Sequence, residues 1–302
     1  MKQSYYSCGK LLITGEYLVL RGARGLALPT SRGQRLDVES ASKGELIWRS
    51  LNEQGQEWFR CDIELATMQV KHSSDNDIAE RLVILLKAAR NLSSNFLSSK
   101  EGFSALTELE FPRDWGLGSS STLVNCIAQW AQVDPFRLFI SSQTGSGYDV
   151  KVAELHGPII FWRNEDEGEA RQVNFNPPFK ESIWFVHLGA KQDSQKEVVR
   201  FSDISVSEQD IDQVTRITRE VIIEKELLGF ERLLREHDLI LSRILSVPTA
   251  FERFSGYEGG YCKYLGAWGG DFMLVTGQSK DLDFFRNTGY DTILSYDEML
   301  LK

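Results

Sequence analysis

Apolar residues recur at helical spacing in several windows of this sequence. In one window, Leu82, Leu85 and Leu86 fall on a single helical face. In another, Leu123 and Ile127 begin a similar stripe directly after a glycine- and serine-rich turn. The windows predict helices over residues 78–89, 119–133, 136–141, 208–226 and 230–245.

Shorter apolar runs, bounded by glycine, proline or polar residues, are typical of strands. They predict strands at residues 10–20, 34–40, 45–50, 107–111, 157–162, 182–188, 272–276 and 292–295, with one more helix at 280–288. Because helices and strands follow one another without regular β-α-β alternation, their order favours an α+β fold with antiparallel sheets. The acidic segment 164–169 and the prolines after it indicate a junction, so we expect domains at 1–165 and 166–302.

The composition narrows the range of partners. The chain of 302 residues has a formal net charge of -9 and is 42% hydrophobic, which is ordinary for a globular protein with one or two cores. A negative balance argues against nucleic acid as a partner, because phosphate backbones are bound by clustered lysine and arginine. It is compatible with a small anionic substrate held in a local basic pocket.

Targeting and metal signals are absent from the sequence. No apolar run is long enough to span a bilayer, and the first residues lack the apolar core of a signal peptide. The four cysteines and four histidines are dispersed, which indicates neither a zinc site nor a disulfide framework. We therefore expect a reduced, cytoplasmic protein without membrane contact, whose oligomeric state the sequence leaves open.

The segment PRDWGLGSSST at 112–122 carries the strongest chemical signal. Its glycines allow the backbone to approach an anion closely, and the helix that follows offers free N–H groups and a positive dipole end. Hydroxyl groups beside them can bind phosphate oxygens or a magnesium ion. An equally weighted alternative is an ordinary glycine-serine turn that caps a helix.

Two further glycine-bearing segments accompany this turn, SCGKLLITGEY at 7–17 and KYLGAWGGD at 263–271. In this order, the three segments resemble the signatures G-K-x-x-x-x-G-E, P-x-x-x-G-L-G-S-S and K-x-x-G-A-x-G-G of the GHMP kinases. The resemblance spans nearly the whole chain. Gly147-Tyr148-Asp149-Val150 also resembles the tag of a G-Y-D-I-A subgroup, with Val150 and Lys151 in place of isoleucine and alanine.

The resemblance implies a two-domain α+β fold. Its N-terminal domain would hold a mixed or antiparallel sheet with helices, and its C-terminal domain a ferredoxin-like α/β sandwich. The implied activity is ATP-dependent phosphoryl transfer to a small anionic metabolite, with ATP and Mg²⁺ as cofactors and mevalonate as the first candidate acceptor. The alternatives are a phosphomevalonate kinase, an ATP-dependent decarboxylase of the same superfamily, and a non-catalytic nucleotide- or ligand-binding relative.

Phosphoryl transfer depends on positioning and charge neutralisation, and the resemblance assigns residues to both. Asp149 is the expected general base or orienting carboxylate, and Lys10 is expected beside it, where an ammonium keeps the carboxylate ionised. Without the resemblance, a lone aspartate in a glycine turn is more simply a turn cap. For Ser121, helix capping is an equal alternative to phosphate binding. The expected ATP ligands are Gly116, Leu117, Gly118, Ser119, Ser120 and Ser121.

The acceptor is expected to contact residues from several segments. Glu16 would bind substrate or orient Lys10, the alternative being a strand-end carboxylate that faces solvent. Trp268 stands where many relatives have glycine, and it either narrows the acceptor pocket or packs between domains. The expected substrate-binding residues are Glu16, Gly147, Tyr148, Lys191, Gly266, Ala267 and Gly269. Ser194, Lys196 and Arg200 are further candidates for an acceptor carboxylate or phosphate, the alternative being a solvated helix start.

The metal site departs from the family pattern. Relatives of the mevalonate kinase type place a magnesium-binding glutamate at the position that Leu138 occupies here, and leucine cannot ligate a cation. We expect Ser120 and the nearby Asp134 to be the protein ligands. Because Mg²⁺ commonly keeps several waters, a site with few protein ligands is physically acceptable.

Overall fold

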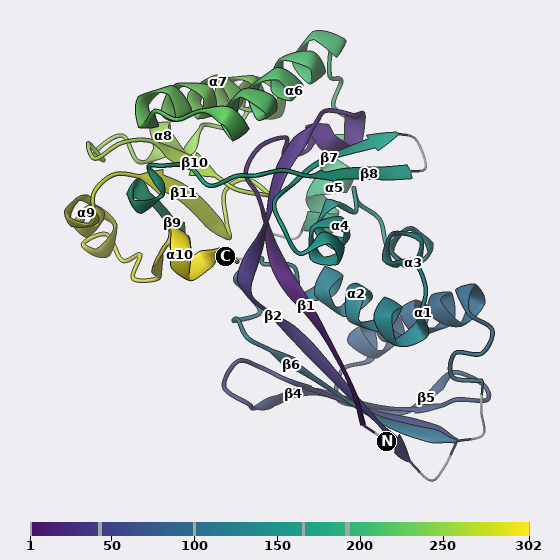
Figure 1. Ribbon diagram of the computed structural model, residues 1–302. Coiled ribbons are helices and arrows are strands. Elements are labelled where there is room, and N and C mark those ends of the chain that lie inside the picture. Colours follow the sequence, from purple (N-terminus) through teal and green to yellow (C-terminus); the bar gives the residue numbers. More distant parts are fainter. Residues whose placement is uncertain (1, 42–43, 99–100, 165–166, 191–193, 302) are drawn as a thin grey trace. The chain divides into compact units, whose positions relative to one another are not determined.

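The structure is a computed structural model that describes residues 2–41, 44–98, 101–164, 167–190 and 194–301 (Figure 1). The chain divides into two compact units, each built from several segments. The first comprises Met1–Gly9, Arg32–Arg113 and Leu117–Glu154, and the second comprises Lys10–Ser31, Asp114–Gly116 and Leu155–Lys302. The expected division into domains 1–165 and 166–302 by a single cut stays a prediction.

The first unit is built on a mainly antiparallel sheet with the strand order β5-β4-β3-β6-β2, and β1 pairs with β2. β3 and β6 run parallel, whereas the pairs β2–β6, β3–β4 and β4–β5 are antiparallel. A Cβ on Gly33 would lie 2.2 Å from the carbonyl oxygen of Ser7, so glycine is required where these two strands cross closely. The strands are β1 (Lys2–Leu12), β2 (Gly25–Ala41), β3 (Glu45–Leu51), β4 (Glu57–Glu64), β5 (Gln69–Ser73) and β6 (Gly102–Leu109).

Helices cover one face of this sheet and bury a single hydrophobic core with it (Figure 1). Aspartates at 75 and 134 cap the first and third helices by accepting hydrogen bonds from backbone N–H groups. The predicted helices at 78–89, 119–133 and 136–141 are confirmed, with small shifts at their ends. The helices are α1 (Asn76–Leu92), α2 (Ser119–Ala131), α3 (Pro135–Ser142) and α4 (Tyr148–Leu155).

The second unit contains a four-stranded antiparallel sheet with the order β10-β11-β9-β12. This is the strand order of a ferredoxin-like sandwich, and α6 packs along α7 (Figure 1). The first residues of β2 also belong to this unit and pair with β7, which pairs with β8. The strands are β7 (Ile159–Asn164), β8 (Glu167–Gln172), β9 (Ile183–His187), β10 (Cys262–Tyr264), β11 (Phe272–Thr276) and β12 (Ile293–Ser295).

The helices of the second unit differ widely in length. Its α-helices are α5 (Ser194–Ser202), α6 (Glu208–Ile223), α7 (Leu227–Leu245), α8 (Ala250–Arg253), α9 (Asp283–Arg286) and α10 (Tyr296–Met299). Three 3₁₀ turns, η1 (Leu18–Arg21), η2 (Lys180–Ser182) and η3 (Ser279–Leu282), complete it. The α+β class with a large, mainly antiparallel sheet and a smaller sheet is thus confirmed. Among the described helices, none combines the length and apolarity needed to cross a bilayer.

The prediction of one continuous strand over residues 10–20 is wrong. Strand β1 ends at Leu12, because Gly15 and Tyr17 both adopt positive φ angles, of 87° and 62°, that an extended strand does not contain. The segment then turns into η1. The helix predicted at 280–288 consists instead of η3 followed by α9.

Candidate functional site

In the first unit, the N-terminus of α2 is open to an anion. Gly118 precedes the helix with a φ of 90°, and no described side chain caps its first N–H groups. Ser120 is exposed and donates a hydrogen bond to Gln143 Oε1 at 3.1 Å. Ser121 is buried and donates to the Gly118 carbonyl at 2.8 Å, rather than accepting from a backbone N–H as a helix cap would. Ser119 and Ser120 are therefore the better placed hydroxyls for a ligand.

Asp149 lies in the first turn of α4, where the sequence predicted only a turn. It is half-buried, and its Oδ1 accepts a hydrogen bond from the Val150 N–H at 3.1 Å. Gly147 just before it has a φ of 79°, and a Cβ there would lie 2.5 Å from the Phe136 ring. Tyr148 is half-buried at the start of the same helix. Glycine and Phe136 therefore fix how this carboxylate is presented.

The residues expected to bind magnesium lie in the first unit as well. Asp134 is exposed and accepts a hydrogen bond from the Arg137 N–H at 2.7 Å as the cap of α3. Leu138 is fully buried. In the described parts of the chain, no three His, Cys, Asp or Glu side chains gather in a metal-binding arrangement. A magnesium site with Ser120 and Asp134 as ligands stays a prediction.

In the second unit, the three signature segments meet. Lys10 Nζ donates a hydrogen bond to the Gly116 carbonyl at 3.0 Å. Gly116 in turn packs on Asp271, because a Cβ at Gly116 would lie 2.2 Å from the Asp271 carboxyl carbon. Residues from 7–17, 112–122 and 263–271 are thus in contact. The placement of Asp149 beside Lys10 stays a prediction.

The contact between Gly116 and Asp271 predicts that Gly116→Ala strongly lowers the stability of the fold. Gly116 has a φ of 67°, which costs an L-residue about 1–2 kcal/mol, and the added methyl group would also displace the buried Asp271 side chain. We expect a destabilisation of about 2–4 kcal/mol, measured by urea unfolding. Gly55→Ala is the matched control, since that glycine also has a positive φ, of 73°, but open space around its missing Cβ. Equal losses in the two variants would contradict the packing role of Gly116.

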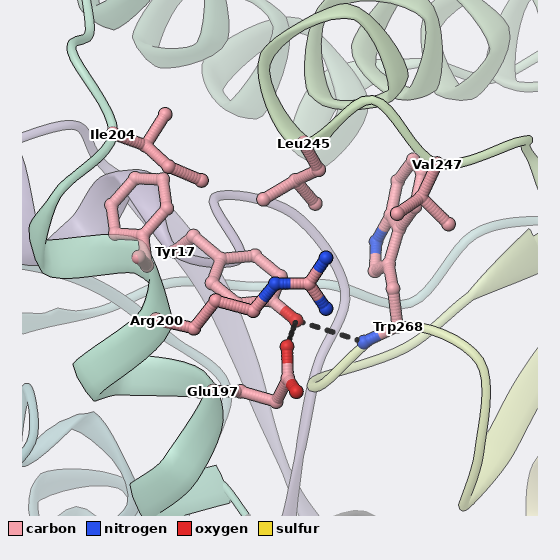
Figure 2. Close-up of a pocket in the computed structure, with 8 residues that line it drawn as sticks. Tyr17, Glu197, Arg200, Ile204, Leu245, Val247 and Trp268 are labelled. Carbon is pink, nitrogen blue, oxygen red and sulfur yellow. Dashed lines mark hydrogen bonds between the residues drawn. The ribbon is translucent and has the colours of Figure 1, made fainter.

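The second unit also contains a pocket of about 220 Å³ (Figure 2). Figure 2 shows the Arg200 side chain extending from α5 across this pocket. Tyr17 Oη accepts a hydrogen bond from the Trp268 backbone N–H at 3.1 Å and faces Glu197 Oε2 at 3.5 Å. Burial raises the pKa of Tyr17 to about 12, so the phenol stays neutral. The remaining lining is apolar and consists of Phe201, Ile204, Leu245 and Val247.

Two residues of this pocket were already singled out from the sequence. Arg200, a candidate anion-binding residue, and Trp268 both line it, whereas a role of Trp268 in narrowing an acceptor pocket stays a prediction. Glu197 was missed, because an acidic residue in a charged helix start carries no distinguishing pattern. Lys191 lies outside the described residues.

The glycines of the third signature shape the loop that carries Trp268. Gly266 and Gly269 have φ angles of 65° and 97°, and Ala267 is buried. A Cβ on Gly266 would meet open space. The loop therefore turns sharply at both glycines and holds the indole of Trp268 against the pocket. Binding of substrate by Gly266, Ala267 or Gly269 stays a prediction.

The residue before Tyr17 belongs to a fully buried ionic cluster. Lys263 Nζ donates to Glu16 Oε1 at 2.7 Å and to Asp238 Oδ1 at 2.9 Å. His237 is the fourth member, and all four residues are at most 1% exposed. Burial by itself would lower the pKa of Lys263, but the Asp238 carboxylate and the hydrogen bonds to Asp238 and Glu16 outweigh it and raise that pKa. The cluster ties the first signature to the third and to α7.

The alternative that Glu16 faces solvent is wrong, because packing against α7 and β10 encloses its side chain. Its expected roles toward substrate and Lys10 stay predictions. The sequence missed Asp238 altogether and treated His237 as a surface or satisfied core histidine. One signal was available, since both residues lie on the face of α7 that Leu234 and Leu241 mark as buried.

Comparisons with known proteins test the fold. No protein-family model and no curated protein matches the sequence. Among solved structures, a mevalonate kinase aligns with a TM-score of 0.71 at 14% identity, over 99% of this chain and 100% of that chain. Lactococcus lactis galactokinase complexed with galactose aligns with a TM-score of 0.69 at 13% identity, over 99% of this chain and 93% of that chain. Streptococcus pneumoniae phosphomevalonate kinase in complex with phosphomevalonate and AMPPNP aligns with a TM-score of 0.68 at 14% identity, over 98% of this chain and 99% of that chain.

Proposed function

We propose that this chain, which has the fold of the GHMP kinases, is an ATP-dependent kinase of a small anionic metabolite. The observation that carries the proposal is the meeting of the three signature segments in the second unit. If each turn had only a local structural role, we would not expect the Lys10 ammonium to bind the carbonyl of Gly116, which lies just before the glycine-serine loop. Because the fold alone does not fix a substrate, the acceptor follows from the residues of the site.

ATP supplies the transferred phosphoryl group, and segment 116–121 would hold its phosphates. The N–H groups at the start of α2 favour an anion, because no described side chain caps them and the helix dipole is positive there. Ser120 fits a magnesium ligand, because its hydroxyl is exposed and oxygen is the donor that Mg²⁺ prefers. Ser119 lies beside it and would contact phosphate oxygens.

Two charged side chains would act on the acceptor. Asp149 accepts the proton of the acceptor hydroxyl or orients that hydroxyl for attack. The Lys10 ammonium stabilises the negative charge that develops on the acceptor oxygen.

The pocket beside Tyr17 supports mevalonate as the acceptor. Its apolar wall fits a short branched hydrocarbon, and Arg200 fits a carboxylate. Sugars carry hydroxyl groups on every carbon and would leave several of them unpaired against this wall. Phosphomevalonate is the second candidate, because Arg200 also fits a phosphate and a phosphomevalonate kinase shares the fold.

A coupled ADP-release assay tests the proposal. The purified chain is supplied with ATP and Mg²⁺ and screened with mevalonate, phosphomevalonate, diphosphomevalonate, homoserine and galactose, with Asp149→Ala as the control. We expect turnover on mevalonate that the control loses. Carbon dioxide release with diphosphomevalonate would instead identify a decarboxylase. Absence of turnover on every compound would remove the kinase proposal and favour a non-catalytic binding protein.

A further inference from the structure

Glu16 occupies a backbone turn under strain. It lies between Gly15 and Tyr17, whose φ angles of 87° and 62° are both in the left-handed region. A non-glycine residue in such a conformation costs about 1–3 kcal/mol and persists only where its surroundings fix it. Tyr17 is that residue, and it lines the pocket. Contacts that fix the neighbouring Glu16 side chain therefore help to hold the Tyr17 backbone in this conformation.

The contacts of Glu16 leave one oxygen without a donor. Its Oε1 accepts a hydrogen bond from Lys263 Nζ at 2.7 Å. Its Oε2 lies 3.2 Å from His237 Nε2, yet this buried oxygen has no hydrogen-bond partner among the described residues. The reason lies in the histidine, because Nε2 already accepts a hydrogen bond from the Gly15 N–H at 2.9 Å.

The other ring nitrogen supports the same tautomer. His237 Nδ1 lies 3.3 Å from Asp238 Oδ1, so it carries the proton and donates it. A neutral imidazole with a proton on Nδ1 has a lone pair on Nε2. If Glu16 were ionised, two electron-rich atoms would face each other at 3.2 Å inside the protein. One proton on Glu16 Oε2 removes this repulsion, and the single lone pair of Nε2 is then shared between two donors, the Gly15 N–H and the Glu16 O–H.

The charge balance of the cluster requires the same proton. Lys263 is the only described ammonium or guanidinium bound to it, whereas Glu16 and Asp238 are two carboxyl groups. With a neutral His237, ionisation of both carboxyls would leave a net negative charge in a fully buried place, which is strongly unfavourable. Asp238 is the one that stays ionised, because it accepts from both Lys263 and Tyr261 Oη.

We propose that Glu16 is a neutral carboxylic acid at physiological pH, that it donates its proton to His237 Nε2, and that it positions Tyr17 rather than binding substrate. The proton joins the first signature to α7, while Oε1 joins the same turn to β10 through Lys263. His237 holds the Gly15 N–H, and His237 and Lys263 hold the two carboxyl oxygens of Glu16. The peptide unit between Gly15 and Glu16 is therefore fixed from both sides. The strained conformation of Tyr17 follows from this clamp.

The charged and titratable groups around Glu16 come from three parts of the second unit. Lys263 faces it from β10, and His237 and Asp238 face it from α7. Tyr17 lies in the same turn, and Tyr261 contacts Asp238 just before β10. Thr218 of α6 presents a neutral hydroxyl to Thr14 nearby. Burial raises the pKa of Glu16, and the opposing charge of Lys263 does not cancel that effect.

The proposal predicts a pH profile of stability. A carboxyl that keeps its proton in the folded state, but loses it on unfolding above about pH 5, stabilises the fold less as the pH rises. Glu16→Gln removes this titration while keeping the geometry, because the amide oxygen accepts from Lys263 and the amide N–H donates to His237 Nε2. Relative to Glu16→Gln, the unfolding equilibrium constant of the wild type should rise by up to about tenfold per pH unit above pH 5.

The experiment measures urea unfolding of the wild type and Glu16→Gln between pH 5 and 9. Glu252→Gln, at an exposed carboxylate that caps α8, is the matched control and should differ from the wild type by a constant amount. A constant difference for Glu16→Gln as well would overturn the proposal. None of these measurements needs an acceptor, so they stand apart from the success or failure of the kinase assignment.

Two further measurements test the protonation state and the positioning role. Infrared spectra of the wild type should contain a neutral carboxyl band at neutral pH, a measurement that does not depend on how well Glu16→Gln folds, and absence of the band overturns the proposal. Hydrogen exchange of the Leu18 and Val19 amides, which bond within this turn, should accelerate in Glu16→Ala and remain slow in Glu16→Gln. Equal exchange in the two variants would show that the side chain does not hold the turn.

Discussion

Asp149→Asn should lower kcat/KM for a hydroxyl acceptor such as mevalonate by about 10²- to 10⁴-fold, the usual contribution of a general base. The asparagine keeps the size of the side chain and can still accept the hydrogen bond from the Val150 N–H. The loss should be much smaller with phosphomevalonate, because an ionised phosphate oxygen has no proton to give up. Steady-state kinetics on both acceptors measures the difference.

A control variant separates chemistry from helix capping. Asp75→Asn replaces another aspartate at a helix N-terminus, where it accepts from the Ile78 N–H at 3.1 Å, and asparagine caps as well as aspartate. This variant should keep the kinetics of the wild type. If Asp149→Asn also kept them on every acceptor that is turned over, Asp149 would be neither base nor orienting group.

Lys263→Met should destabilise the protein severely, by about 3–5 kcal/mol. Lys263 is fully buried, so methionine fills most of its volume but leaves the Asp238 carboxylate without its ammonium. Such a loss is a large part of the total stability of a typical domain, which is about 5–15 kcal/mol. Urea unfolding at pH 7 measures it.

The matched control is an exposed ion pair of the same unit. Lys180 Nζ lies 2.9 Å from Asp297 Oδ1 at the surface, and Lys180→Met should cost no more than about 1 kcal/mol because water replaces the lost partner. The double variant Lys263→Met with Glu16→Leu should not lose the sum of the two single effects, since both act on one cluster. Additive losses would contradict a coupled network.

The sequence predicted most helices and the strand Phe272–Thr276 because these depend on local pattern. The faces of α1 and α2 carry apolar residues at helical spacing, and β11 is a short apolar run bounded by polar residues and glycine. It missed α4 because the residues before it, glycine and serine, are typical of turns. It also extended β1 through Gly15, because the run of apolar residues hides two left-handed residues.

The candidate site also contains residues that local patterns predicted and residues that they did not. The resemblance of three signatures to one family predicted the fold, because glycine and lysine at fixed spacing are visible in a single chain. The contact of Lys10 with Gly116 was not predicted, because it depends on tertiary packing. Arg200 was found from its position after a predicted strand. Glu197 and Asp238 were not, because nothing local distinguishes them from the many acidic residues on helix surfaces.

The sequence by itself therefore determined the class of fold, since this follows from residue spacing, whereas anion binding by the glycine segments stays a prediction. Tertiary structure decided which charges are buried together. Glu16, His237, Asp238 and Lys263 come from three distant segments, and only packing removes water from all of them at once. Removing an ionisable group from water changes the free energy of its protonation and therefore its pKa. Because the group loses its water only when the chain folds, the sequence alone does not reveal this change.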